Sequence, residues 1–299
     1  MSISTSGAQG NGYSWAVGIS AYGRFVVFNS DATNLVPGDT NTQSDVFVRD
    51  RRSGETTRVS VTSSGAQADQ SPNEFGGSRA GGISANGRYV AFGSDATNLV
   101  PHDTNRAGDV FVHDSVTGKT QRVSVSSSGR QANRPAVAGI PAISADGRYV
   151  AFMSTASNLV RGDTNRKWDV FVHDRVTGKT QRVSVSSAGR QANGDNEASP
   201  AISASGRYVA FASFASNLVP GDSNGAGDDF IHDRVTHRTL LASLSSTGEQ
   251  GNDSSYVDTG ALSADARYLA FSSWASNLAP DANPAPDVFV RDFGAPLDR

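Results

Sequence analysis

The sequence predicts an all-β protein, a single five-bladed β-propeller that spans residues 1–299 with four antiparallel strands in each blade. Three observations lead to this fold. One phrase recurs five times at almost even spacing, short runs of β-branched and aromatic residues alternate with turn-forming residues, and the two chain ends complement each other. Abundant Ser, Gly, Asn and Asp also favour all-β structure.

The recurring phrase has the form I-S-A-x-G-R-Y-V-A-F. Its first apolar residue is Ile19, Ile83, Ile143, Ile202 and Leu262 in turn, at successive offsets of 64, 60, 59 and 60 residues. Further along each unit come a D-x-N-x-x-x-D segment and a D-V-F-V-x-D run or a close variant of it. Self-similarity at a fixed period is typical of repeat architectures. We expect the blade units to begin near residues 16, 80, 140, 199 and 259.

Each unit is predicted to hold four short strands, as the third unit illustrates. Runs rich in Val, Ile, Phe, Tyr and Thr, bounded by Gly, Asn or Asp, predict strands at residues 141–144, 148–154, 169–174 and 180–187. No stretch sustains a helical apolar period. Asp146-Gly147 closes the first hairpin, where Gly supplies a positive φ, and Ala266 replaces that Gly in the fifth unit.

The two chain ends predict that the repeats close into a ring. The last unit stops after Asp292 and lacks a fourth strand, while the opening residues M-S-I-S-T-S-G match V-S-V-S-S-S-G at residues 123–129. A shared blade would leave no sheet edge open, whereas a linear solenoid would carry atypical capping repeats. We therefore expect residues 1–6 to supply the outer strand of the C-terminal blade and to close the ring.

The repeated run S-x-D-G-R-Y-V-A-F, followed by D-V-F-V-x-D and T-G-K-T, resembles the TolB-like propellers, also called WD40-like (PD40) repeats. The resemblance covers essentially the whole chain. It implies a propeller and supports the strand order, but it implies little about chemistry, because such blades serve assembly factors, peptidases and bacterial exoproteins. It also implies a secreted or periplasmic bacterial location, with any signal peptide outside this chain.

Composition excludes several classes of function. The net charge is −3 with acids and bases interspersed, so nucleic acid is not an expected partner. No apolar run approaches the length of a membrane span, so no membrane insertion is expected. The chain has no cysteine, which excludes disulfides, thiol catalysis and Cys-ligated zinc. We expect a monomer whose ligand is a glycan or a protein.

The D-x-N-x-x-x-D loops allow two interpretations. Oxygen ligands at the first, third and seventh positions suit a hard cation, so the loops could hold structural calcium. No other cofactor is expected. Alternatively, Asp and Asn bond their own backbone in Asx-turns, because the fifth position is never acidic. The positions concerned are Asp39, Asn41, Asp45, Asp103, Asn105, Asp109, Asp163, Asn165, Asp169, Asp222, Asn224, Asp228, Asp281, Asn283 and Asp287.

The loop between units, and the position just after the second strand, differ from blade to blade. Both kinds of loop leave the same face of a propeller, so this loop-bearing face is the expected working surface. Arg79 and Asp95 are among the variable positions. With blades four, five and one adjacent in a closed ring, an aromatic sector that stacks sugar rings or grips a peptide is predicted there. Its residues are Tyr13, Trp15, Phe214, Asp253, Tyr256, Asp258 and Trp274.

No catalytic constellation is evident. His113, His173 and His232 share one repeat position with Arg49 and Arg291, which indicates a structural donor rather than a metal ligand. No G-x-S-x-G elbow or H-E-x-x-H motif is present. The first hypothesis is a non-catalytic binding or scaffolding propeller. The alternatives are a glycoside hydrolase or lyase that uses loop carboxylates, and a repeat lectin with up to five equivalent sites.

Overall fold

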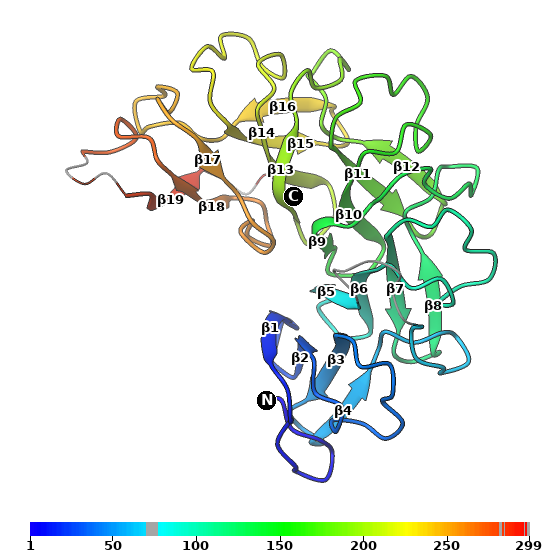
Figure 1. Ribbon diagram of the computed structural model, residues 1–299. Helices are drawn as coiled ribbons and strands as arrows, with labels where there is room; N and C mark the ends of the chain where they lie inside the picture. Colours follow the sequence, from blue (N-terminus) through cyan, green and yellow to red (C-terminus); the bar gives the residue numbers. More distant parts are fainter. Residues whose placement is uncertain (70–76, 281–282, 284, 296, 298–299) are drawn as a thin grey trace.

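The computed structural model describes residues 1–69, 77–280, 283, 285–295 and 297. Over these residues the chain forms nineteen strands in five antiparallel sheets, four with four strands and one with three. The sheets follow one another in chain order around a curved array (Figure 1). None of the described residues forms a helix long and apolar enough to cross a membrane.

The sheets are numbered 1 to 5 in chain order. Sheet 1 contains β1 (Ser14–Ile19), β2 (Phe25–Ser30), β3 (Asp45–Asp50) and β4 (Glu55–Arg58). Sheet 2 contains β5 (Ser78–Ile83), β6 (Tyr89–Ser94), β7 (Asp109–Asp114) and β8 (Lys119–Arg122). Sheet 3 contains β9 (Ala138–Ile143), β10 (Tyr149–Ser154), β11 (Asp169–Asp174) and β12 (Lys179–Arg182). Sheet 4 contains β13 (Asn196–Ile202), β14 (Tyr208–Ser213), β15 (Asp228–Asp233) and β16 (Arg238–Leu241). Sheet 5 contains β17 (Ser255–Tyr256), β18 (Tyr268–Ser273) and β19 (Asp287–Asp292).

The two middle strands of each sheet pair over six residues in one common register. In sheet 3, Tyr149 lies opposite Asp174 and Ser154 opposite Asp169. The pair at the centre of this register is Phe152 and Phe171, whose stacked rings lie 5.9 Å apart. The repeated phenylalanines thus form a cross-strand pair in every sheet. The other pairs are Phe28–Phe47, Phe92–Phe111, Phe211–Phe230 and Phe271–Phe289.

An arginine and an aspartate lock one end of each middle hairpin. In sheet 3, Arg148 Nη2 lies 2.7 Å from Asp174 Oδ2 and Nε lies 2.9 Å from Oδ1. The same carboxylate accepts the backbone N–H of Val176 and so also holds the following turn. The Arg148 guanidinium holds the pKa of Asp174 well below its usual range. The repeated Arg and Asp therefore serve the fold of each blade.

The apolar core lies between neighbouring sheets. Val110 and Val112 of β7 pack against Val150 and Phe152 of the next sheet in one buried cluster. The same arrangement recurs between sheets 1 and 2 and between sheets 3 and 4. Each sheet therefore buries one face only when a following sheet covers it.

The inner hairpins add a hydrogen bond at every step from sheet to sheet. Ala85 N donates to Ala145 O over 2.9 Å, and Ala145 N donates to Ala204 O over 3.0 Å. Next to these bonds, Gly147 lies against the Tyr89 ring of the preceding sheet, and the Arg175 guanidinium stacks on that ring at 4.4 Å from its centroid. Backbone and side-chain contacts together fix the position of each sheet relative to its neighbour.

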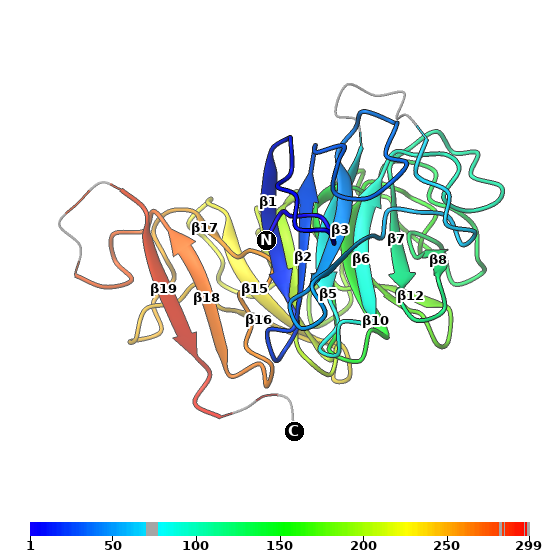
Figure 2. The same cartoon turned by 90° about the horizontal axis from the view of Figure 1, so that it is seen from below.

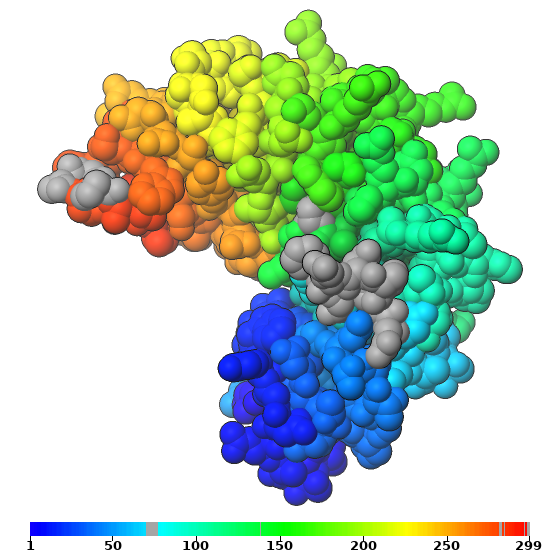
Figure 3. Space-filling view, in the orientation of Figure 1, coloured from blue at the N-terminus to red at the C-terminus, as the bar shows by residue number. Residues whose placement is uncertain are grey.

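The predicted ring closure is not what the structure shows. Sheets 1 and 5 stand apart at the two ends of the array in Figure 1, and in the turned view of Figure 2 sheet 5 lies to the left while sheet 1 lies near the centre. The space-filling view shows open space between them (Figure 3). Residues 1–6 lie on sheet 1 instead, where Thr56 Oγ1 donates to Ile3 O over 2.6 Å and Thr56 N donates to Thr5 Oγ1 over 3.0 Å. Sheet 5 has three strands in the described residues.

The correction has a local cause. The prediction treated residues 180–187 as one strand, but β12 ends at Arg182 and the chain then forms a small hairpin with a bridge between Val185 and Gln191. The opening residues match this hairpin rather than the strand before it, and Ile3 bridges Gln9 in the same way. Residues 1–6 therefore correspond to a connection between blades and hold no equivalent of a fourth strand.

A buried carboxyl interrupts the core between sheets 4 and 5. Asp229 is fully buried where the other sheets have Val46, Val110, Val170 and Val288. The structure pairs neither of its oxygens with a side chain, and burial raises the pKa of Asp229 well above its ordinary value. Phe271 packs in a small group separate from the main cluster of this junction. The last junction is therefore the weakest-packed of the four.

We expect Asp229→Val to stabilise the chain by about 1–3 kcal/mol at neutral pH, because it removes a buried unpaired carboxyl and restores the repeat. The wild type should lose stability as pH rises from about 4 towards the raised folded pKa, since the folded state holds a proton that the unfolded state has released. Urea denaturation at pH 5 and pH 8 measures both effects. Asp229→Asn should remove this pH dependence with a smaller gain, and equal stability of Asp229→Val and wild type at pH 8 would contradict the interpretation.

Substitutions of Gly147 and Gly178 can separate the effect of the contact between sheets from the effect of backbone strain. Gly147 (φ +75) has no room for a Cβ, which would lie 2.1 Å from Tyr89, whereas Gly178 (φ +71) faces open space. Gly178→Ala should cost about 1 kcal/mol of unfolding free energy from strain. Gly147→Ala should cost about 2–4 kcal/mol, because it also displaces the Tyr89 ring. Similar losses in urea melts of the two variants would show that the ring contact contributes little.

Candidate functional site

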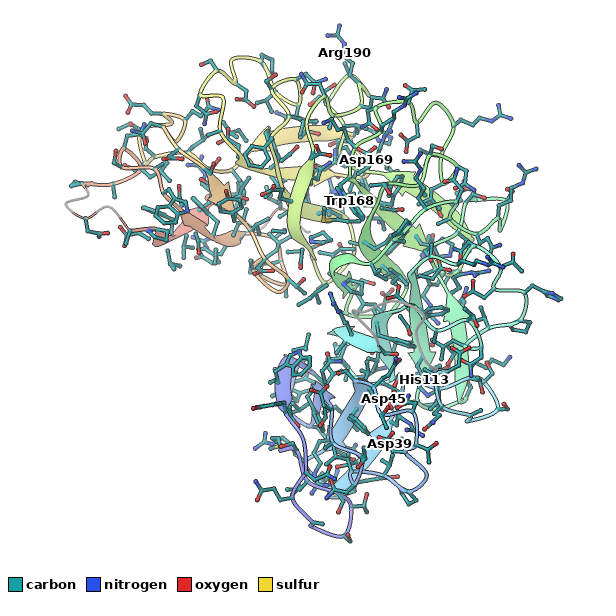
Figure 4. All side chains as sticks on the ribbon, viewed as in Figure 1. Asp39, Asp45, His113, Trp168, Asp169 and Arg190 are labelled. Atoms are coloured by element: carbon teal, nitrogen blue, oxygen red, sulfur yellow. The ribbon has the colours of Figure 1, made fainter. Side chains whose placement is uncertain are left out.

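The D-x-N-x-x-x-D loops hold an arginine between two carboxylates. In sheet 2, Arg122 Nη1 lies 3.0 Å from Asp103 Oδ1 and 3.1 Å from Asp109 Oδ2. Ser124 Oγ donates to the other oxygen of Asp109 over 2.5 Å. Burial raises the pKa of Asp109 to about 6, although Ser124 and Arg122 both favour its charged form. Figure 4 shows the equivalent Asp39 and Asp45 close together in sheet 1.

The asparagine of each loop forms the Asx-turn of the second interpretation. Asn105 Oδ1 accepts the backbone N–H of Ala107 over 3.2 Å, and its Nδ2 donates to Asp109 Oδ2 and to Ala132 O. Similar contacts occur at Asn41, Asn165 and Asn224. In sheets 1 to 3 the cation between the carboxylates is an arginine of the chain: Arg58, Arg122 and Arg182.

Sheet 4 departs from this pattern. Leu241 stands at the arginine position, and Gln250 Nε2 bridges Asp222 at 2.9 Å and Asp228 at 2.8 Å. Within the described ranges, no group of three His, Cys, Asp or Glu side chains is arranged to hold a metal ion. Asp281 lies outside the described residues. Asn283 lies in the loop before β19, and Asp287 is the first residue of β19. Calcium binding stays a prediction.

The three repeated histidines belong to the third strands of sheets 2 to 4, and each lies opposite a threonine of the fourth strand. His113 Nδ1 lies 3.0 Å from Thr120 Oγ1, whose hydroxyl donates to Val61 O of the preceding unit. Burial lowers the pKa of His173 and of His232 to about 4 and lowers that of His113 as well. These imidazoles are neutral at pH 7 and connect neighbouring units, which is a structural arrangement.

The predicted aromatic sector is divided by the open array. Tyr13 and Trp15 are exposed on sheet 1, whereas Phe214 and Trp274 are exposed after β14 and β18. Sheets 1 and 5 stand apart, so the structure does not bring the first pair beside the second (Figure 3). Tyr256 packs into the core between sheets 4 and 5, and Asp253 and Asp258 are exposed near it in the chain.

A pocket of about 630 Å³ opens on the loop-bearing face between sheets 2 and 3. Gly93 and Gly108 form part of its wall. Sheet 3 carries Met153 and Trp168 at these two repeat positions, and both pack into the next core. The other sheets carry small or polar residues at these positions, as sheet 2 does, and Val137 lies where a Cβ on Gly93 or Gly108 would be. Its remaining lining includes Arg79, Asp95, Arg106, Pro135 and Val137.

Sequence reasoning found this pocket only in part. Arg79 and Asp95 stood out as positions that the repeat does not dictate, but nothing joined them to each other or to Arg106. The missed signal was the pair of glycines, because their effect depends on the neighbouring loop at residues 135–137 that approaches them. Such a contact between sheets cannot be seen in one repeat unit alone.

The chain has the fold of a β-propeller. It is similar to the β-propeller domain of the Trilobed protease from Pyrococcus furiosus, described as having an open velcro topology, with 10% identity and a TM-score of 0.53 over 95% of this chain and 70% of that one. It is also similar to TolB from Acinetobacter baumannii, with 13% identity and a TM-score of 0.48 over 91% of this chain. The chain spans about half, 53%, of that TolB.

A putative TolB from Agrobacterium tumefaciens matches at 16% identity with a TM-score of 0.46, over 93% of this chain and 73% of that one. The match to the Trilobed protease propeller confirms the predicted resemblance as a likeness of fold, and identities of this size show the fold alone. No protein-family model and no curated protein sequence matches the chain.

The buried arginines of the loops can be tested directly. Arg182→Leu, which copies sheet 4, should cost about 2–4 kcal/mol of unfolding free energy at pH 7, because it leaves Asp163 and Asp169 facing each other without a cation. The loss should shrink near pH 4, since burial already raises the pKa of both carboxyls and protonation removes their repulsion. Thermal and urea denaturation at both pH values measure this.

The exposed Arg190, which points outward in Figure 4, provides the matched control, and Arg190→Leu should leave stability unchanged. A pH-independent loss in Arg182→Leu would indicate a packing defect instead. The same melts with millimolar calcium test the calcium prediction, because a bound ion would raise the melting temperature.

Proposed function

We propose that this chain is a non-catalytic binding propeller that takes an acidic glycan in the pocket between sheets 2 and 3. The single observation that carries the proposal is the pocket itself, a concave site of about 630 Å³ whose lining includes the variable positions Arg79 and Asp95. A residue that the fold does not require is a better functional candidate than one that the fold does require.

The chemistry of the lining supports an acidic sugar. Arg79 and Arg106 lie at the pocket, and a guanidinium recognises a carboxylate through two parallel hydrogen bonds. Pro135 and Val137 offer an apolar surface to the C–H face of a sugar ring, and Asp95 can accept hydrogen bonds from hydroxyl groups. A single pocket of this composition also favours one ligand per chain over the five equivalent sites of a repeat lectin.

Binding without cleavage is favoured by the carboxylate content. Glycosidases generally use two carboxyl groups that flank the scissile bond. Among the described residues that line the pocket, Asp95 is the one carboxylate. A ligand of this kind agrees with the secreted or periplasmic location implied by the family resemblance, which we retain as part of the proposal.

The proposal predicts that Arg106→Glu weakens binding of polygalacturonate, alginate or hyaluronan at least tenfold, because it replaces an attraction by a repulsion. The matched control is Arg166→Glu, since Arg166 holds the same repeat position, also has a positive φ and is also exposed. Isothermal titration with the polysaccharide and with its methyl-esterified form measures affinity, stoichiometry and dependence on the carboxylate. Assay of new chain ends in the same mixtures tests cleavage.

One site per chain, lost in Arg106→Glu and kept in Arg166→Glu, would support the proposal. Equal affinities of the two variants, or equal binding of the esterified polymer, would contradict it. The appearance of new chain ends would favour the hydrolase or lyase alternative.

A further inference from the structure

Sheet 5 presents an unpaired strand edge. In sheets 1 to 4 a fourth strand covers the outer edge of the third, but no described residue pairs with the outer edge of β19. Of the described residues after Asp292, Phe293 and Leu297 pack with the core between sheets 4 and 5. An open strand edge offers a row of backbone donors and acceptors to another strand.

The four complete sheets show what fits such an edge. In sheet 2, the buried Thr120 of β8 donates its hydroxyl to Val61 O over 2.5 Å and its N–H to Ser63 Oγ over 3.0 Å. The hairpin that accepts these bonds comes from the unit before. The corresponding residues of sheets 1, 3 and 4 are Thr56, Thr180 and Thr239, held by the same two kinds of bond.

The groups that would hold this threonine in sheet 5 are already in position. The preceding hairpin is bridged between Leu244 and Gln250, as in the other units. Arg291 Nη1 donates to Ser245 O, just as Arg49 Nη1 donates to Ser4 O in sheet 1. Arg49 also reaches the threonine of its fourth strand, over 2.9 Å.

The corresponding place in sheet 5 is a cavity. Arg291, Leu244, Gln250 and Phe293 border a cavity of about 670 Å³. The Nε of Arg291 is buried without a hydrogen-bond partner. Because Nε is also without a partner in Arg58, Arg122 and Arg182 of the complete sheets, the cavity rather than this atom marks the place where the threonine would lie.

The aspartate at the start of the third strand indicates a second property of the segment that would fit the edge of β19. Two residues after the threonine, the fourth strands of sheets 1 to 3 carry an arginine that pairs with the aspartate at the start of the third strand, as Arg122 pairs with Asp109. Asp287 holds that position in sheet 5, at the start of β19. In sheets 1 to 3 the complete run is T-x-R-V-S, at residues 56–60, 120–124 and 180–184.

An apolar surface adjoins the edge. Val288 is 76% and Val290 64% exposed, whereas their counterparts Val110 and Val112 are buried to about 1% or less. A macromolecule that delivers a strand to β19 can cover these side chains as well, which a free small molecule cannot. The occupant is therefore part of a protein.

We propose that the edge of β19 binds an extended segment of a partner protein, with the pattern T-x-R-V-S, as the missing fourth strand of sheet 5. The threonine hydroxyl bonds Leu244 O beside Arg291, the arginine pairs with Asp287, and the backbone pairs with β19. This site is separate from the glycan pocket and does not depend on it.

The test uses a fluorescein-labelled synthetic peptide with the sequence of residues 177–187, T-G-K-T-Q-R-V-S-V-S-S, titrated with the full chain by fluorescence anisotropy. We expect saturable binding of one peptide per chain, and none of a scrambled peptide. Peptides with Thr180→Val or Arg182→Gln should each bind at least tenfold more weakly, which corresponds to about 1.4 kcal/mol or more. Variation in the peptide leaves the folding of the protein untouched.

Protein variants locate the site. Arg291→Ala should weaken binding at least tenfold, whereas Arg49→Ala, at the same position of the complete sheet 1, should leave it unchanged. The Asp287→Asn variant of the protein should bind the Arg182→Gln peptide about as tightly as the unchanged peptide. In that variant the ion pair between the peptide arginine and Asp287 is already lost. Equal binding of the scrambled peptide, or an equal effect of Arg49→Ala and Arg291→Ala, would overturn the proposal. Sedimentation of the chain without peptide gives a further test. A dimer that Val290→Asp dissociates would also overturn the proposal, because a second copy of the chain would then occupy the edge of β19.

Discussion

The structure depends on one constraint: each sheet has an apolar face that only the next sheet can cover. The valines of the third strand, such as Val110 and Val112, supply that face, and the second strand of the following sheet receives it. The alanine ladder of the inner hairpins and the contact of Gly147 with Tyr89 fix the relative position of the two sheets. A chain of such interfaces has two ends, and at each end one half of an interface is left without its partner.

Much of the fold could be predicted from the sequence because the repeat records these interfaces. The five units, their strand order and the left-handed turn at Ala266 (φ 56) all follow from local patterns. Closure could not be predicted in the same way, because it depends on how far each sheet is rotated from the last. The ends even keep matching side chains: Arg51 bonds Gly23 O as Arg175 bonds Gly147 O, and Tyr268 of sheet 5 is exposed. The matching residues show which contacts an interface between sheets 1 and 5 would contain. Whether that interface forms depends on the geometry of the four other interfaces.

Features of functional interest lie where the repeat is broken. In the D-x-N-x-x-x-D loops of sheets 1 to 3 the carboxylates bond to arginine, serine and asparagine of the chain itself, and in sheet 4 a glutamine takes the place of the arginine. By contrast, the lining of the pocket between sheets 2 and 3 includes the variable positions Arg79 and Asp95, and the outer edge of β19 has no partner strand among the described residues. The sequence identified the variable positions, but their grouping depends on contacts between sheets that a single unit does not contain.

The open array is the central claim, and a distance measurement between the end sheets tests it most directly. The chain has no cysteine, so spin labels can be placed at equivalent turn positions by substituting Tyr22 in sheet 1, Asn86 in sheet 2 and Asp265 in sheet 5. In a closed ring of five equal units, pulsed electron resonance would give the same distance for labels at 22 and 265 as for labels at 22 and 86. The open array predicts a clearly longer distance between positions 22 and 265. Two equal distances would contradict it and would show that the ends meet in solution.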